Sequence, residues 1–432
     1  MKRSNSKEST DEKKFSPELG LSSSQYASYL FSSSVADAIL PIFYIFLPIF
    51  AQKIGATAFE LGLVGGSSYA VYSFMPLIMG HFSDRSRSRK FFILTSFVLL
   101  AVVSFFYSIT LSPITLIITR LFEGTGWAML WPAMEASISE DSLRDSKKSL
   151  GVFNYVWSGG AALGPVIGTL LVSYSFRFAF FASGILFVIL IALNGLGFIA
   201  RRKSHMPGTF AKESSMRSYD STYSSLSSSI REFFFSQDQK RRMQVWVCLL
   251  TTALSASTSG VFFTFFGPYA TKDIGLTLFM IGAVTTTYGV IRFFSYVVIA
   301  KQMIREKVFG ARNRNLVLFA SLASLSSLIL MIRDPSGTLY FVSFALFAIG
   351  YSTVYAIAQF TLIAESVPEQ RGASAGLFES SIGIGAAIGP IVAGAISSRS
   401  LDFSFIVPAA GLGFVIVILL IVSSRLRPSS GT

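Results

Sequence analysis

Residues 160–165 read Gly-Ala-Ala-Leu-Gly-Pro, and residues 385–390 repeat this hexapeptide with one change, as Gly-Ala-Ala-Ile-Gly-Pro. Other residues recur at the same offset of 225, and residues nearer the start of each copy recur at an offset of 220. Examples are Leu121 with Leu346, Phe153 with Phe378, Pro48 with Pro268 and Gly55 with Gly275. The chain is therefore predicted to contain two copies of one fold.

The composition around this repeat is that of a membrane protein. Of the 432 residues, 52% are hydrophobic and 14% are charged, whereas about 25% of residues are charged in ordinary soluble domains. The mean hydropathy is +0.58. Apolar runs of about 20 residues, which is the length a helix needs to cross a bilayer, recur along the chain. Most of the chain is therefore predicted to be surrounded by lipid.

We predict an all-α membrane protein with twelve transmembrane helices in two pseudo-symmetric halves of six. The spans of the first half are Tyr26–Phe50, Phe59–Phe82, Phe91–Leu111, Ile114–Ile138, Leu150–Tyr174 and Phe178–Ala200. Those of the second half are Trp246–Ala270, Leu276–Ala300, Leu316–Ile332, Thr338–Ile363, Ala373–Ile396 and Phe403–Val422. Two parallel six-helix repeats are typical of transporters that bind a solute between the halves, near the midplane of the membrane.

These spans divide the chain into an N-terminal tail (1–25), a first half (26–200), a serine-rich linker (201–243), a second half (244–424) and a C-terminal tail (425–432). Of the 36 Lys and Arg residues, 29 fall on the side that holds both tails and the linker. Because cytoplasmic loops are enriched in Lys and Arg, both termini are predicted to be cytoplasmic, in a multi-pass protein of the cell membrane. This enrichment also accounts for the net charge of +13, so no nucleic-acid partner is predicted.

No enzymatic chemistry is predicted. The two histidines, His81 and His205, are not accompanied by Cys, His or carboxylate residues at a metal-binding spacing. The sequence also lacks a Gly-x-x-x-x-Gly-Lys loop for the phosphates of ATP. We therefore expect no metal and no cofactor. Transport must draw on an ion gradient.

The loop between the second and third spans reads Gly-His-Phe-Ser-Asp-Arg-Ser-Arg-Ser-Arg-Lys, residues 80–90. It resembles the Gly-x-x-x-Asp-Arg-x-Gly-Arg-Arg/Lys motif of the major facilitator superfamily, although Arg87 and Ser88 depart from that pattern. The resemblance implies an ion-pair latch that holds the two halves together in one conformation, with its carboxylate near Gly372 at the start of the eleventh span. The residues of this latch are Gly80, Asp84, Arg85, Arg89 and Lys90.

Two further motifs extend the resemblance over nearly the whole chain. The fourth span contains Arg120-Leu-Phe-Glu-Gly124, which is similar to the Arg-x-x-x-Gly motif of that span in the superfamily. The fifth span resembles a Gly-Pro motif found mainly in the drug:proton antiporter branch. Small residues four apart let helices approach closely, and proline bends a helix. These packing residues are Gly160, Gly164, Pro165 and Gly168, with Gly385, Gly389 and Pro390 in the second half.

Charged residues within spans indicate the transport pathway, because each is costly at the centre of the bilayer unless it faces protein or water. Asp37 lies near the middle of the first span, and its repeat partner is Ser257. On the fourth span, one helical face carries Arg120, Glu123, Trp127, Trp131 and Met134. We predict that this face forms a cavity wall, with Asp37 and Glu123 as proton carriers tuned by Arg120. The alternative is a structural ion pair between Arg120 and Glu123, with both tryptophans packed against neighbours.

Three more charged residues are assigned to gating. Arg292 and Glu379 lie at similar depths in the eighth and eleventh spans, so they are expected to pair or to form an inner gate. A purely structural pair is the alternative for these two residues. Glu135 lies near the cytoplasmic end of the fourth span, and we assign it to the latch beside Arg85.

The favoured function is proton-coupled efflux of small apolar or amphipathic compounds by alternating access. The partners are then a small-molecule solute, protons and the lipid bilayer, and one chain suffices as a monomer. The rival is a proton symporter that imports a sugar, organic acid or other metabolite, and a remote alternative is a non-transporting membrane sensor. Candidate cavity residues beyond the fourth span are Tyr44, Asn154, Ser257 and Gln359, and Trp157 is a further candidate for a sugar site.

Overall fold

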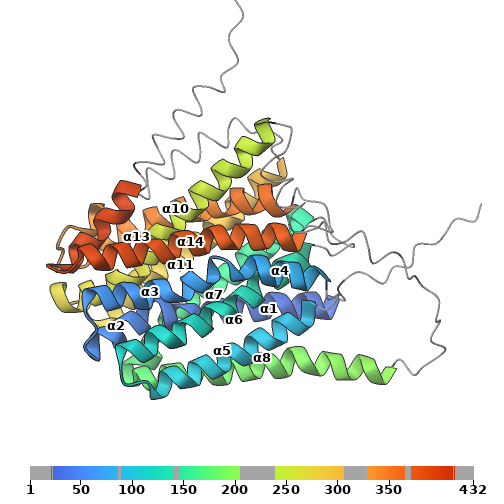
Figure 1. Cartoon of the computed structure of the whole chain (residues 1–432), viewed down its shortest axis with the longest axis horizontal. Coiled ribbons are helices and arrows are strands. Elements are labelled where there is room, and N and C mark those ends of the chain that lie inside the picture. The colour runs from blue at the N-terminus through green and yellow to red at the C-terminus, as the bar shows by residue number, and fades with distance from the viewer. Residues whose placement is uncertain are drawn as a thin grey trace, which may run out of the picture.

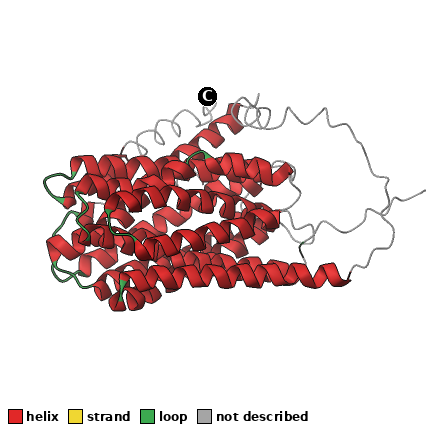
Figure 2. Ribbon diagram, turned by 60° about the horizontal axis from the view of Figure 1, so that its bottom comes forward, coloured by secondary structure: helices red, strands yellow, loops and turns green. Residues whose placement is uncertain are grey.

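The computed structural model describes residues 23–85, 89–139, 146–204, 239–305, 328–364 and 371–411, together with residues 21, 326 and 413. Regular secondary structure in these ranges is helical throughout (Figure 2). The predicted tails and nearly all of the predicted linker lie outside the described residues. The helices run side by side, with the first half below and the second half above in Figure 1.

Each half is a bundle of long helices. The first half contains α1 (Ser23–Pro41), the π-helical turn η1 (Ile42–Phe46), α2 (Leu47–Lys53), α3 (Ala58–Tyr72), α4 (Met75–Arg85), α5 (Arg89–Ile109), α6 (Pro113–Ser139), α7 (Ser146–Tyr174) and α8 (Phe176–Ser204). The second half contains α10 (Gln239–Tyr269), η2 (Ala270–Ile274), α11 (Leu278–Arg305), α13 (Thr338–Gln359), η3 (Phe360–Ala364), α14 (Arg371–Ile396) and η5 (Leu401–Phe405).

Nine helical stretches of the described chain are long and apolar enough to cross a membrane. The predicted fourth span is present as α6, whose 27 residues also suffice for a crossing. Most of the predicted ninth span lies outside the described residues, as does the second half of the predicted twelfth span. The fold is that of a helical membrane protein, as the hydropathy pattern predicts.

The predicted second span is present as one apolar stretch, Ala58–Met79, with a turn within it. Helix α3 ends at Tyr72, and α4 starts at Met75 after a turn. Pro76 lies at the start of α4, and it has no backbone N–H to donate to a carbonyl in the preceding turn. The continuous apolar run from Phe59 to Phe82 concealed this break.

The duplication is visible in the backbone as well as in the sequence. Gly55 and Gly275 follow the first helix of each half, and both have a positive φ, of 94° and 84°. Glycine occupies this left-handed region without a steric penalty. In each half, a threonine directly before or near the start of the next helix caps its first turn. The Thr57 Oγ1 accepts a hydrogen bond from the Glu60 backbone N–H, and the Thr277 Oγ1 accepts one from Met280.

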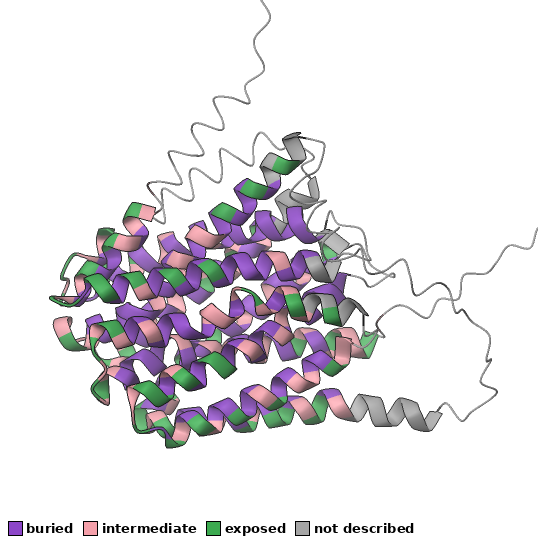
Figure 3. Cartoon of the chain, viewed as in Figure 1, coloured by how far each residue is buried: buried purple, intermediate pink, exposed green. Residues whose placement is uncertain are grey.

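The two halves meet along two seams. Helix α3 packs against α14, and α7 packs against α11. Buried residues face these seams, whereas exposed residues cover the outward faces of α5 and α8 (Figure 3). Small residues bring the backbones together at the seams. A Cβ at Gly62 would lie 2.5 Å from the Pro390 carbonyl oxygen, and a Cβ at Gly289 would meet the Ala161 carbonyl.

Within each half, the repeated glycines lie where two helices touch. A Cβ at Gly160 would fall on the carbonyl oxygen of Ser34 in α1, and a Cβ at Gly164 would lie 2.5 Å from that of Ala38. Their counterparts in α14 face α10 in the same way, with Gly385 on Ala253 and Gly389 on Ser257. Gly168 lies against the Phe46 ring, and Pro165 and Pro390 lie inside α7 and α14.

A substitution at Gly160 tests this packing. In Gly160→Ala, the new methyl group must push α1 and α7 apart, which should lower the free energy of unfolding by about 1–3 kcal/mol. The matched control is Gly159→Ala, because a Cβ at Gly159 meets no atom within 4 Å and alanine favours the helix. Melting temperatures in detergent measure both variants. Equal melting temperatures for the two variants would contradict the packing role.

Candidate functional site

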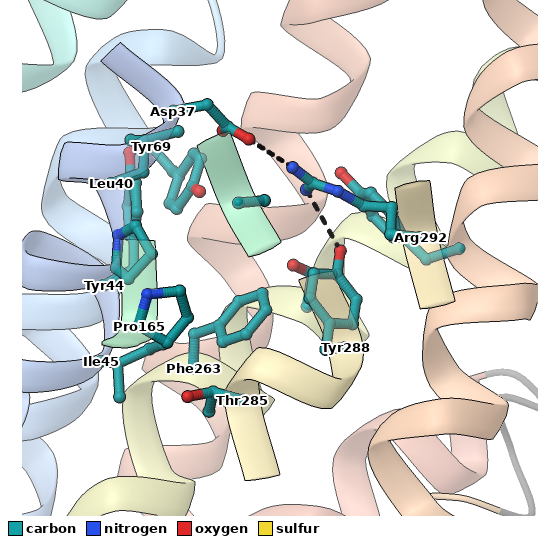
Figure 4. A pocket seen from close by; sticks show the side chains of 14 residues that line it. Asp37, Leu40, Tyr44, Ile45, Tyr69, Pro165, Phe263, Thr285, Tyr288 and Arg292 are labelled. Atoms are coloured by element: carbon teal, nitrogen blue, oxygen red, sulfur yellow. Dashed lines mark hydrogen bonds and ion pairs between the residues drawn. The ribbon is translucent and has the colours of Figure 1, made fainter. Parts of the chain in front are cut away.

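A cavity of about 120 Å³ lies between the two halves (Figure 4). The first half lines it with Asp37, Leu40, Pro41, Tyr44, Ile45, Tyr69, Ala161 and Pro165, and the second half with Ser259, Phe263, Thr285, Tyr288, Arg292 and Tyr351. The walls are mainly aromatic and aliphatic, with two charged residues at one end. This is the composition of sites that bind small organic molecules.

An ion pair across the two halves closes this end of the cavity. Arg292 of α11 lies 2.5 Å from Asp37 of α1, measured from Nη2 to Oδ2, and their side chains are 8% and 2% exposed. The guanidinium group also stacks on the Trp157 ring at 4.3 Å, and it lies 3.5 Å from the Tyr288 hydroxyl. Each charge is therefore neutralised by the other half of the molecule.

The expected pairing of Arg292 with Glu379 is wrong. Arg292 pairs with Asp37 because α11 packs against α7, and α7 in turn packs against α1. Glu379 lies on α14, which packs against α3, and it accepts a hydrogen bond of 2.6 Å from the Tyr72 hydroxyl. Similar depth in the membrane did not reveal which helices are neighbours.

Tyr44 lies in the cavity wall, as predicted, and its position follows from the π-helical turn η1 between Pro41 and Pro48. Its ring stacks on that of Tyr69 at 5.3 Å, and the Arg120 guanidinium lies 4.8 Å from the ring centroid. Such turns are frequent at functional sites because they redirect side chains within a helix. The sequence pattern missed Tyr69 as a cavity residue.

Arg120 and Glu123 form the structural ion pair that was the alternative to a cavity wall. Arg120 Nη1 lies 2.8 Å from both carboxylate oxygens of Glu123, and the Arg120 Nε donates to the Val64 carbonyl. Glu123 also accepts hydrogen bonds from the Tyr107 hydroxyl and the Trp127 indole N–H. Both oxygens of the Glu123 carboxylate therefore accept hydrogen bonds from residues of the first half. Neither Arg120 nor Glu123 lines the cavity.

The predicted aromatic wall on the fourth span also lies elsewhere. Trp127 stacks on Trp131 with ring centroids 5.8 Å apart, and Met134 is fully buried. None of the three lines the cavity. Helix α6 packs against α3, α4, α5, α7 and α14. On this face Trp127 contacts Phe187 of α8, and Trp131 contacts Trp157 of α7. Helical spacing identified one face of α6, but it did not indicate what that face contacts.

Asn154, Gln359 and Glu135 form a hydrogen-bonded chain between the halves. The Asn154 amide donates to the Gln359 Oε1 at 2.6 Å, and the Gln359 amide donates to the Glu135 Oε1 at 2.7 Å. Trp157 donates its indole N–H to the Asn154 Oδ1. Glu135 is thus buried and hydrogen-bonded to residues of the second half, whereas the Arg85 side chain, beside which we expected it, lies outside the described residues. Ser257 packs against Gly389 at the contact of α10 with α14.

The latch can be followed through its helices, because the side chains of Asp84 and Arg85 lie outside the described residues. Helix α4 packs against α14, and a Cβ at Gly376 would lie 2.6 Å from the Pro76 carbonyl oxygen. Gly80, Asp84 and Arg85 belong to α4, whereas Arg89 and Lys90 begin α5. The predicted position of Asp84 beside Gly372 lies outside the side chains that the structure describes.

Comparison with known proteins identifies the family. The model of the Major Facilitator Superfamily matches residues 26–360 and 248–431. The chain belongs to the major facilitator superfamily. This family consists of membrane transporters, and the chain has the helices of a multi-pass membrane protein.

Curated relatives are distant. The quinolone resistance protein NorA of Staphylococcus aureus (strain MRSA252) is 22% identical over 397 residues, which is 88% of this chain and 92% of that protein. The proton-coupled antiporter flippase LtaA of Staphylococcus haemolyticus is 25% identical over 41% of this chain and 45% of its own length. Two uncharacterised transporters of Methanocaldococcus jannaschii are matched over 36% and 37% of their length, so the chain spans about a third of each.

Solved structures share the fold. A bacterial homologue of the human lysosomal transporter Spinster, in an inward-facing and occupied conformation, has a TM-score of 0.67 at 13% identity, covering 94% of this chain and 98% of that one. The nucleoside transporter NupG also has a TM-score of 0.67 at 13% identity, over 94% and 99% of the two chains. At such identities the likeness supports the fold alone.

The pair of Asp37 with Arg292 gives a testable energetic coupling. Removing one partner leaves a buried charge unpaired, so Arg292→Gln should lose about 3 kcal/mol of unfolding free energy. The double variant Asp37→Asn with Arg292→Gln should recover part of this loss, because neither charge is then left alone. Thermal unfolding of the wild type, both single variants and the double variant in detergent measures the coupling. Additive losses would contradict the ion pair.

Proposed function

We propose that this transporter exports small apolar or amphipathic compounds in exchange for protons, by alternating access between its two halves. The observation that carries the proposal is the cavity between the halves, which joins an aromatic wall to the ion pair of Asp37 with Arg292. We place the protein in the cell membrane with both termini cytoplasmic. Because one chain contains the whole cavity, we propose the monomer as the working unit.

The ion pair supplies a route for coupling. When Asp37 is ionised, it holds α1 of the first half to α11 of the second half. A proton on Asp37 removes that attraction, and Arg292 must then find another partner. The two states of one carboxyl group therefore favour different arrangements of the halves, which is what coupling of proton movement to rocking requires.

The wall of the cavity favours apolar or amphipathic solutes. Tyr44, Phe263 and Tyr288 present ring surface, and aromatic faces bind organic cations as well as apolar groups. In the present conformation the cavity of about 120 Å³ is smaller than the roughly 300–1,000 Å³ typical of sites for drug-sized ligands. We infer that loading requires the halves to separate around the cavity.

The positions of the polar residues that a sugar site would need favour efflux over symport. Asn154 and Gln359 donate and accept hydrogen bonds with each other, with Trp157 and with Glu135. They do not line the cavity, so they have little capacity to replace the water around a sugar hydroxyl. Likeness in sequence to NorA, a quinolone resistance protein, extends over most of the chain and points in the same direction.

Proteoliposomes with an imposed pH gradient test the proposal. We expect lipophilic cations or a quinolone to drive proton movement opposite to their own, and we expect Asp37→Asn to lose at least about 90% of this coupled flux because its side chain cannot carry a proton. Glu60→Gln is the matched control, since Glu60 lies in the exposed cap of α3.

Two outcomes would count against the proposal. Proton movement in the same direction as a sugar, a nucleoside or an organic acid would replace efflux by symport. Unchanged coupled flux in folded Asp37→Asn would remove Asp37 from the coupling mechanism. Binding of the solute to detergent-solubilised protein separates these outcomes from a simple loss of the binding site.

A further inference from the structure

Two carboxyl groups from opposite halves meet inside the protein. Glu135 belongs to α6 in the first half, and Glu379 belongs to α14 in the second half. Their exposed fractions are 1% and 4%, and the two carboxyl groups lie close enough for one hydroxyl, that of Tyr355, to be within hydrogen-bond distance of an oxygen of each. A hydrogen bond between two carboxyl groups needs a proton, since an ionised carboxylate can only accept.

The surroundings of this carboxyl pair donate hydrogen bonds but carry no positive charge among the described residues. The Tyr72 hydroxyl lies 2.6 Å from the Glu379 Oε2, and the Gln359 amide lies 2.7 Å from the Glu135 Oε1. The Tyr355 hydroxyl lies 3.3 Å from one Oε1 and 3.4 Å from the other. The Glu135 Oε2 is buried without a donor from the described part of the chain.

The other titratable groups that the structure describes near Glu135 and Glu379 add no positive charge that could compensate two ionised carboxylates. Tyr296 of α11 interacts with Tyr355, and Tyr351 of α13 interacts with both Tyr355 and Glu379. Both are phenols, which are neutral near pH 7. Arg292 of α11 is engaged by Asp37. Two ionised carboxylates in this space would therefore repel each other at low dielectric, with hydrogen bonds as their sole compensation.

We propose that Glu135 and Glu379 form a second proton-binding site, in which one shared proton joins the two halves between the cavity and the predicted cytoplasmic ends of α6 and α14. With the proton bound, the pair is a hydrogen bond across the interface. Without the proton, two negative charges face each other, and the halves separate on this side. The bound proton thus keeps the two halves together on the predicted cytoplasmic side, and we call this contact of Glu135 with Glu379 the inner gate. The proposal concerns the gate alone and does not rest on proton-coupled efflux.

The sign of the pH dependence follows from the number of protons bound. The closed gate holds one proton more than the open gate, in which both carboxylates reach water. Closure is therefore favoured as pH falls. The ratio of closed to open molecules changes by at most about tenfold per pH unit, because one proton is released.

Distances between spin labels measure this gate without any transport assay. In a Cys248→Ala background, labels at Phe91 and Val298 report on the predicted cytoplasmic side, and labels at Leu111 and Phe279 report on the opposite side; all four positions are exposed. We expect the inner distance to be short at about pH 5 and longer at about pH 9, which brackets the titration range of buried carboxyl groups.

Amide variants identify the group that titrates. In Glu379→Gln the amide N–H replaces the shared proton as donor to Glu135, so the inner distance should stay short at both pH values. The surface control Glu60→Gln should keep the pH response of the inner distance. An unchanged pH response in Glu379→Gln, or no response in the wild type, would overturn the proposal.

Sodium distinguishes a proton from a metal cation at the same oxygens. Replacing Na⁺ with choline at about pH 8 should leave the inner distance unchanged, because the proposal places a proton, and not a metal cation, between the two carboxyl groups. Opening of the gate on removal of Na⁺ would mean that a cation bridges the carboxylates, and it would overturn the shared proton.

Discussion

A charge inside a bilayer must find its partner within the protein, and this requirement arranges the interior of this transporter. Arg120 and Glu123 satisfy each other within the first half. Asp37 and Arg292 satisfy each other across the two halves. The first pair therefore stabilises a rigid bundle, whereas the second can form only while the halves are in contact. The same electrostatic need serves the fold in one place and the conformational equilibrium in the other.

The duplication retained the scaffold and diversified the polar interior. Glycines at several helix contacts and at one positive-φ turn occur in both copies, as Gly160 with Gly385, Gly164 with Gly389 and Gly55 with Gly275. The buried charged side chains at the interface do not: Ser257 stands at the repeat position of Asp37, Asn154 at that of Glu379 and Tyr72 at that of Arg292. The two ends of the interface consequently use different chemistry, an ion pair at the cavity and uncharged or proton-sharing groups beyond it.

The sequence predicted the fold more fully than the site. Hydropathy and the repeat located the helices, because each span must be apolar over a fixed length. The turn between Tyr72 and Met75 was missed, because the hydropathy of an apolar run does not show whether the helix is continuous. Asp37 and Arg292 were both singled out as charges within spans, but their pairing depends on which helices are neighbours. Tyr69 and Tyr288 carried no signal beyond their aromatic character, although Tyr288 lies one turn before Arg292.

The seams at Gly62 and Gly289 have a mechanical consequence. Where backbone lies directly against backbone, as at these two glycines, one helix can slide or tilt over the other with little change of side-chain rotamers. If side chains of the two helices interlocked, one helix could move past the other only in steps of about one helical turn. At these seams, small movements of one helix over the other are therefore not limited to such steps. The energy barrier to rocking is then set mainly by the polar contacts at the interface, which a proton or a bound solute can make and break.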